Sequence, residues 1–399
     1  MADERDTAYD LIIKDGQVLD PGSGLNLRAD VGVIAGRIAA IAPDLPVQPP
    51  KIEYPPHLGT QVVDASGKCV SPGFVDLHAH MFTGVCPLTI PADPVASRTG
   101  VTTMISAGDA GAYSIGGFRK LIVEQTHTNI LAFLNISLVG LITWPHGELV
   151  DIAYADVDAA ISAIEDNRDI VVGIKVRETA PDVVGDNGLE PLMRALQVGE
   201  ATGLPVMCHV GNTPTDLNQL LALLRPGDIL THCFTGSNNN LAIDGELASG
   251  ALEARERGVL FDIGHGFGSF DYTVADIAFG EGFHPDIIST DLHSLSAAGP
   301  AKDLPTTMSK LLCMGMELEE VLLSVTTRPA AAVGRSNEFG ALQVGRGADL
   351  TVFDIEEGPR EVQDAYGNSR VLDREFRILE TIRKGVPWGG PYPHPGRAI

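Results

Sequence analysis

The chain has 399 residues, a formal net charge of −24 and a pI of about 4.7. This acidity argues against nucleic acid and against anionic membrane surfaces as partners, because both favour basic proteins. The length suits one large barrel with a smaller unit. The charged start predicts no secretory signal, and no apolar run reaches the ~18 residues of a membrane span. Five irregularly spaced cysteines predict reduced thiols, so we expect a cytoplasmic protein.

Both ends of the chain are rich in strand patterns. Segments 11–14 and 17–19 flank Asp15-Gly16, and segments 31–34 and 37–41 flank Ala35-Gly36, so each dipeptide predicts a hairpin turn. Six prolines within residues 43–56 predict an irregular loop. Further short strands are expected at 61–64, 69–70, 349–354 and 380–383. We therefore predict that residues 1–72 and 336–388 form a split small β domain, a β-sandwich, and that residues 389–399 form an irregular tail.

The middle of the chain alternates buried strand patterns with helical ones. Eight strands are expected, at 74–80, 101–107, 130–137, 170–175, 205–209, 228–232, 259–263 and 287–291. Helical spacing follows at 157–164 and 187–202. Near-continuous apolar strands indicate a parallel sheet buried on both faces. Residues 73–335 are thus predicted to form a (β/α)8 TIM barrel in an α/β fold. A doubly wound open sheet is the competing fold, but no Gly-x-Gly-x-x-Gly follows the first strand.

Polar residues close five of these strands. His78 and His80 lie two positions apart, so a strand projects both imidazoles from one face. The other strand ends carry Lys175, His209, His232 and Asp291. The carboxyl ends of the strands form one face of a barrel, and polar groups there are costly unless they are paired or ligated. The pattern predicts a metal site. Cys208 and Cys233, each adjacent to a histidine, would face away from it.

The constellation resembles the amidohydrolase superfamily of metal-dependent hydrolases over nearly the whole chain. The superfamily pattern is matched by residues 72–80 (PGFVDLHAH), 173–175 (GIK), 208–209 (CH), 231–232 (TH) and 289–291 (STD). Within it, residues 173–177, 261–266, 290–293 and 303–310 are similar to a deacetylase-type family whose members hydrolyse acetylated α-hydroxy acids. The resemblance implies a deacetylase or amidohydrolase that cleaves an ester or amide bond of a small acylated organic acid.

The resemblance also implies a role for each strand-end residue. His78, His80 and Asp291 would hold one divalent metal ion and His209 and His232 a second, with Zn²⁺ as the expected metal. Lys175 would be carboxylated by CO₂ and bridge the two ions; a lysine paired with a carboxylate beside a single ion is the alternative. A hydroxide shared by the metals would attack the acyl carbonyl, and Asp291 would be the catalytic base.

Three residues near the strand ends are candidate substrate contacts. Arg177, two positions past Lys175, could pair with a substrate carboxylate, and His265 and His293 could line the substrate site. A cyclic amide hydrolase such as a dihydroorotase or hydantoinase is the alternative, although dihydroorotases carry an arginine where this chain has Phe82. A deaminase or a non-catalytic homologue is disfavoured by the complete ligand set. The expected partner is a small-molecule substrate, and homo-oligomerisation stays open.

Overall fold

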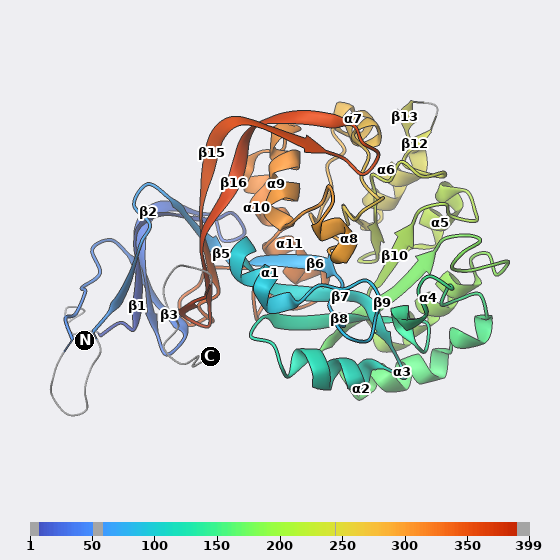
Figure 1. Cartoon of the computed structure of the whole chain (residues 1–399), viewed down its shortest axis with the longest axis horizontal. Helices are drawn as coiled ribbons and strands as arrows, with labels where there is room; N and C mark the ends of the chain where they lie inside the picture. The colour runs from blue at the N-terminus through green and yellow to red at the C-terminus, as the bar shows by residue number, and fades with distance from the viewer. Residues whose placement is uncertain (1–7, 51–58, 244, 389–399) are drawn as a thin grey trace.

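The computed structural model describes residues 8–50, 59–243 and 245–388 (Figure 1). Two large sheets organise these residues, a mostly antiparallel sheet of eight strands and a curled parallel sheet of seven strands, and β12 (Ala242–Ile243) and β13 (Glu246–Leu247) pair separately. The first sheet joins the two ends of the chain, and the second forms the barrel between them. The predicted TIM barrel with a small β-sandwich domain is confirmed, whereas the exact domain boundaries stay a prediction.

The eight-stranded sheet has the order β17-β16-β15-β5-β1-β2-β3, with β4 paired to β1. Its strands are β1 (Leu11–Asp20), β2 (Leu25–Ile34), β3 (Arg37–Ala42), β4 (Gln61–Asp64), β5 (Cys69–Pro72), β15 (Leu350–Gln363), β16 (Ser369–Arg383) and β17 (Val386–Pro387). The predicted turn at Ala35-Gly36 is confirmed: both residues have positive φ and join β2 to β3.

The predicted hairpin at Asp15-Gly16 is wrong, because β1 runs through this dipeptide as one strand with a register shift. Asp15 has a φ of 60° and its N–H donates to Asp30 Oδ1 at 2.8 Å, so the dipeptide forms a bulge. A Cβ on Gly16 would lie 2.4 Å from Val70 Cγ2. Glycine is therefore required for the close approach of β5, and the dipeptide does not reverse the chain.

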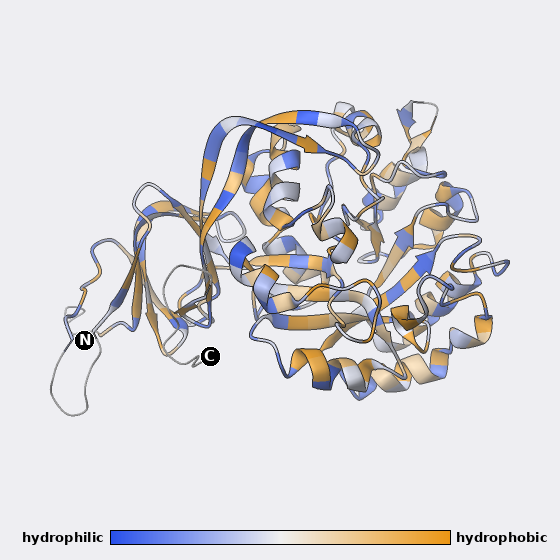
Figure 2. Ribbon diagram, viewed as in Figure 1, coloured by the Kyte–Doolittle hydropathy of each residue, from blue (hydrophilic) through white to orange (hydrophobic). Residues whose placement is uncertain are grey.

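The barrel sheet has the order β14-β11-β10-β9-β8-β7-β6, with all neighbours parallel. Its strands are β6 (Phe74–Ala79), β7 (Val101–Gly111), β8 (Asn129–Asn135), β9 (Val171–Glu178), β10 (Val206–Val210), β11 (Ile229–Thr231) and β14 (Leu260–Asp262). Figure 2 shows hydrophobic residues along these strands. Their burial on both faces explains why the sequence predicted them well.

The predicted eighth strand, residues 287–291, closes the barrel without forming a regular strand. Single bridges join Ile287 to Asp262 of β14 and Leu292 to Ala79 of β6. Between them, the Thr290 N–H donates to the Asp76 side chain at 3.0 Å. A carboxylate oxygen here replaces a backbone carbonyl, so the strand pairing is interrupted next to Asp291.

Helices surround the barrel and carry recognisable end signals. They are α1 (Ala92–Thr99), α2 (Ile115–Phe118), α3 (Val157–Glu165), α4 (Glu190–Thr202), α5 (Leu217–Leu223), α6 (Ser249–Glu256), α7 (Tyr272–Gly280), α8 (Ser294–Ala297), α9 (Leu304–Cys313), α10 (Leu318–Ser324) and α11 (Thr327–Ala332). Asp156 caps α3 through a hydrogen bond to the Ala159 N–H, and Gly203 ends α4 with a φ of 72°. Among the described residues, no helix is long and apolar enough to cross a membrane.

Strands β15 and β16 extend beyond the small sheet as a long hairpin that arches over the barrel (Figure 1). At the hairpin tip, Asp364 accepts the Tyr272 N–H of α7 at 3.0 Å. The Tyr366 hydroxyl donates to the Gly268 carbonyl at 3.0 Å, in the loop after β14. The C-terminal hairpin is therefore fastened to loops that surround the mouth of the barrel.

Candidate metal centre

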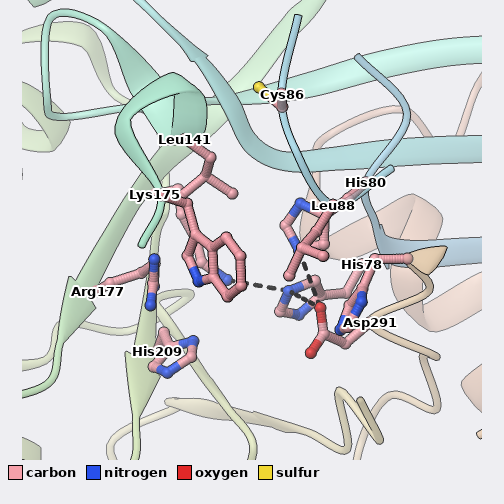
Figure 3. A pocket seen from close by; sticks show the side chains of 11 residues that line it. His78, His80, Cys86, Leu88, Leu141, Lys175, Arg177, His209 and Asp291 are labelled. Atoms are coloured by element: carbon pink, nitrogen blue, oxygen red, sulfur yellow. Dashed lines mark hydrogen bonds and ion pairs between the residues drawn. The ribbon is translucent and has the colours of Figure 1, made fainter. Parts of the chain in front are cut away.

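The six residues predicted as metal ligands lie together at the carboxyl ends of the barrel strands (Figure 3). Asp291 Oδ1 lies 2.9 Å from His80 Nε2 and 3.4 Å from His78 Nε2. Lys175 Nζ lies 3.2 Å from His78 Nε2, and His232 Nε2 lies 2.8 Å from His209 Nδ1. One ligand atom each of His78, His232 and Asp291 fall within 4.8 Å of one another. The donor set and its spacing fit a divalent metal centre.

Hydrogen bonds on the outer side of three rings hold these histidines in place. His80 Nδ1 lies 2.6 Å from Asp109 Oδ1, and His232 Nδ1 lies 2.6 Å from the Gly264 carbonyl. His78 Nδ1 lies 2.9 Å from Thr231 Oγ1, whose hydroxyl donates to Asp262. Each partner can accept a hydrogen bond from Nδ1, which leaves the Nε2 atom of each ring facing the site. Such outer contacts orient imidazoles for a metal ion.

The backbone at two of these residues is strained. His232 has a φ of 67° and Asp291 a φ of 48°, in the left-handed region that residues other than glycine rarely adopt. The neighbouring turn 264–266 follows β14 and is glycine-rich because it packs closely on both residues. A Cβ on Gly264 would lie 2.8 Å from His232 Nδ1, and one on Gly266 would lie 2.4 Å from Asp291 Oδ2. The strain aims both side chains into the site.

Burial shifts the charge states in the cluster. Burial, and then the adjacent Lys175, hold the pKa of His78 well below its usual range. Burial lowers the pKa of Lys175 to about 8, although the carboxylates of Asp291 and Asp262 oppose the shift. At pH 7 this pKa leaves Lys175 mostly protonated, with about a tenth of it as the neutral amine, far more than for an exposed lysine. The neutral amine is the protonation state in which a lysine can react with CO₂.

The ligands open into a cavity of about 130 Å³. Figure 3 shows Lys175, Arg177 and His209 reaching into it from one side and His78, His80 and Asp291 from the other. Its remaining lining is largely apolar and comes from Cys86, Leu88, Leu141 and Trp144, with His293. The cavity therefore combines a polar floor with an apolar wall and has room for a small substrate.

Arg177 is part of an ion pair that the sequence did not reveal. Its Nη1 lies 3.2 and 3.3 Å from the two carboxylate oxygens of Glu148, which is fully buried. The Arg177 side chain itself retains 15% exposure and lines the cavity. Glu148 thus fixes one edge of the guanidinium and offsets part of its charge. Within the described part of the chain no hydrogen bond engages the other guanidinium nitrogens, so a ligand in the cavity can reach them.

The two remaining substrate candidates lie in different surroundings. His293 lines the cavity, and its ring centre lies 6.1 Å from that of His80. His265 is fully buried outside the cavity lining. The Nε2 atom of His265 lies 2.8 Å from Lys310 Nζ, and the His265 ring stacks on Phe270. Lys310 Nζ also donates to the carbonyls of Pro300 and Gln363. The structure therefore makes His265 a support of the turn 264–266 and separates it from the substrate cavity.

Sequence reasoning missed Asp109, Glu148 and Asp262. Asp109 lies on β7 beyond the predicted strand end at 107, and it also accepts the N–H groups of Met81 and Phe82. Asp262 follows the apolar run of its strand, as the metal-binding residues do, and this signal could have found it. Glu148 is in a loop, where no periodicity marks a buried carboxylate. The five cysteines are free thiols, and Cys208 and Cys233 are buried in the hydrophobic core.

Comparisons with known proteins agree with this geometry. Models of the amidohydrolase family match residues 61–179 and 271–387. A deacetylase of Agrobacterium fabrum is 39% identical over 79% of this chain and 78% of its own length. A deacetylase of Enterococcus faecalis is 36% identical over 94% of this chain and 98% of its own length.

Two solved structures extend the similarity to the fold. A crystal structure titled as an adenine deaminase has a TM-score of 0.87 and 34% identity, and covers 95% of this chain and 99% of its own. One titled as a dihydroorotase has a TM-score of 0.86 and 32% identity with the same coverage. The barrel and the buried histidine and aspartate cluster thus define a metal-dependent hydrolase that acts on amide or ester bonds. The chain belongs to the amidohydrolase family.

Proposed function

We propose that this hydrolase uses a binuclear Zn²⁺ centre bridged by a carboxylated Lys175. His78, His80 and Asp291 would hold one ion and His209 and His232 the other. The proposal rests on Lys175, whose buried amine lies 3.2 Å from His78 Nε2 amid the imidazoles. An ammonium beside two dications would be repelled, whereas a carbamate would attract both. Its formation joins Nζ to the carbon of CO₂, and the amine releases one proton to water.

Each residue then has a distinct task in hydrolysis. Metal ions held at this site would lower the pKa of water and polarise an acyl carbonyl. Asp291 takes the proton of the attacking water and returns it to the departing alkoxide or amine. Burial opposes ionisation of Asp291, but the hydrogen bond and charge of His80 hold the pKa of Asp291 below its usual range. Asp291 is thus an anion ready to accept a proton.

Lys175→Ala tests the metal bridge. The variant is expected to hold at most one equivalent of metal, against two in the wild type, and to lose activity. Short carboxylic acids should partly restore both, because a free carboxylate can occupy the place of the carbamate. Isotopically labelled bicarbonate should give a carbamate NMR signal in every protein that keeps Lys175 and none in Lys175→Ala. Lys120→Ala, a surface lysine paired with Glu124, is the control. Two equivalents of metal in Lys175→Ala would contradict the proposal.

The substrate that fits best is an ester or amide of a small acylated organic acid, such as an acetylated or N-acyl α-substituted carboxylate. The observation that carries this is the Arg177 guanidinium, held by buried Glu148 at the edge of a cavity of about 130 Å³. A guanidinium that is already held by Glu148 can bind a substrate carboxylate through its remaining N–H groups with little loss of side-chain entropy. The deacetylases to which the chain is similar support an acyl substrate.

Arg177→Met tests the carboxylate contact. A charged hydrogen bond usually contributes about 1.5–3 kcal/mol, so kcat/KM for an O-acyl hydroxy acid should fall roughly 10–150-fold. The neutral methyl ester of the same compound should be hydrolysed at nearly the wild-type rate. Arg177→Lys keeps the charge without the fork and should recover only part of the loss. Equal losses on the acid and its ester would make Arg177 purely structural.

A cyclic amide hydrolase is the second candidate, favoured by the similarity to a structure titled as a dihydroorotase. At position 82, where dihydroorotases carry an arginine, this chain has a phenylalanine and so lacks that contact for a cyclic acid. Phe82 is buried and packs on Phe118, with ring centres 5.3 Å apart. Parallel assays of the metal-loaded enzyme on dihydroorotate, hydantoins, adenine and acylated acids separate the candidates. Turnover of only the first three would exclude the acyl substrate.

A further inference from the structure

A second cavity, of about 660 Å³, lies away from the metal centre. Its walls come from the β2–β3 turn, from segments 337–339 and 345–349, from Asn129 and from the end of β16. Asn129 is the first residue of the parallel strand β8. The cavity therefore lies at the N-terminal face of the barrel, where it meets the small sheet, and the metal centre lies at the opposite face.

Four basic side chains line this cavity: Arg37, Arg346, Arg383 and Lys384. Arg383 pairs with Asp349 at 2.6 Å, so its charge is offset. Among the described residues, Arg37, Arg346 and Lys384 have no carboxylate within 4.0 Å. Arg37 and Arg346 are nevertheless fixed, because Nη1 of each donates to a backbone carbonyl at 2.9 and 2.6 Å respectively.

The lack of partners is notable because acidic residues outnumber basic ones by 52 to 28 in this chain. Elsewhere arginines pair readily, as Arg225 does with Asp228. The two carboxylates that line the cavity are both engaged, Asp349 by Arg383 and Glu338 by Arg335 at 2.7 Å. Three cations thus line one cavity whose two carboxylates are already paired with other arginines, and the amide of Asn337 adds a hydrogen-bond donor.

We propose that this cavity binds a small oxyanion that carries two or more negative charges, either a phosphate or a polycarboxylate. Guanidinium groups match the oxygen pairs of both ligands, and the volume falls within the range of small-molecule sites. The ligand would contact Arg37 of β3, Lys384 at the end of β16 and Arg346 of the segment after the barrel. These three residues belong to the small β domain, and Asn129 of β8 lines the same cavity from the barrel. Binding would therefore brace the small sheet beside the barrel and stabilise the fold, with no part in hydrolysis.

Thermal unfolding of the full-length, metal-loaded protein tests the site with inorganic phosphate and with tricarballylate, each against chloride at equal ionic strength. A ligand at 100 times its Kd should raise Tm by about 2–5 °C. A shift with either oxyanion, or with both, supports the proposal and shows whether the site takes phosphates, polycarboxylates or both. No saturable shift with either one overturns it.

Two variants and a matched control locate the effect. Arg37→Gln/Arg346→Gln/Lys384→Gln should abolish the Tm shift and the binding measured by titration calorimetry. Asn337→Asp, a single exposed change that adds a carboxylate to the cavity, should weaken binding at least tenfold and guards against misfolding of the triple variant. Arg98→Gln/Arg374→Gln removes two cations outside the cavity and should keep the full shift. Equal shifts in all variants would contradict the site, whatever the hydrolytic activity shows.

Discussion

At the scale of single residues, the sequence predicted a ligand set that the structure brings together, because each member is a polar residue that closes an apolar strand. This signal does not depend on knowing how the strands pack. The residues that orient the ligands were not predicted, since Asp109 meets His80 only through the pairing of β6 with β7. Likewise, the loop residue Glu148 acquires its partner Arg177 only in three dimensions.

Asp291→Asn tests the proposed base at this scale. The amide oxygen can still coordinate, so most of the metal should be retained. kcat should fall about 10²–10⁴-fold, because the amide cannot accept the proton of water. Elemental analysis and steady-state kinetics provide both measurements, with the surface substitution Asp373→Asn as control. If kcat stays within threefold of the wild type, another group must transfer the proton.

At the scale of elements, buried parallel strands were predicted to within a few residues, since their apolar runs need no tertiary context. The errors arise where side chains replace backbone partners. Asp30 holds the bulge in β1, and Asp76 interrupts the barrel-closing segment. A dipeptide such as Asp15-Gly16 has the same local signal in a bulge and in a hairpin turn, and only the packing of β5 on Gly16 separates the two.

Strand β9 offers a prediction about pH. Glu178 directly follows Arg177 on β9, so the two side chains point to opposite faces of the sheet. Glu178 is fully buried, and within the described part of the chain neither of its carboxylate oxygens accepts a hydrogen bond of ordinary length. Burial raises the pKa of Glu178 to about 8 from its usual value of 4.5. The folded chain then holds a proton that the unfolded chain releases, so the free energy of unfolding falls as pH rises between these values.

Glu178→Gln should remove this pH dependence. The variant should be more stable than the wild type by a few kcal/mol at pH 9, and the difference should shrink toward pH 5. Urea unfolding at a series of pH values measures it, with Glu200→Gln, an exposed glutamate of α4, as control. A wild-type stability that rises relative to the variant with increasing pH would show that Glu178 is ionised and paired.

At the scale of the whole molecule, the charge of −24 opposes the approach of an anionic substrate. Screening lengths fall from about 30 Å at 0.01 M salt to about 8 Å at 0.15 M. We therefore expect kcat/KM for an acylated carboxylate to rise several-fold over this range, while a neutral ester stays unchanged. Stopped assays at constant metal concentration test this. A fall with added salt would mean that local positive charge at Arg177 outweighs the global field.

The hairpin of β15 and β16 has a consequence for biosynthesis. Strand β15 pairs with β5 from the beginning of the chain, and the hairpin tip is fastened to α7 and to the loop after β14. During synthesis, the edge of β5 and the barrel mouth therefore lack these contacts until β15 and β16 have emerged from the ribosome. Domains usually fold as units during synthesis. In this chain β5 can gain its partner β15, and the barrel mouth its hairpin contacts, only after β15 and β16 have been synthesised.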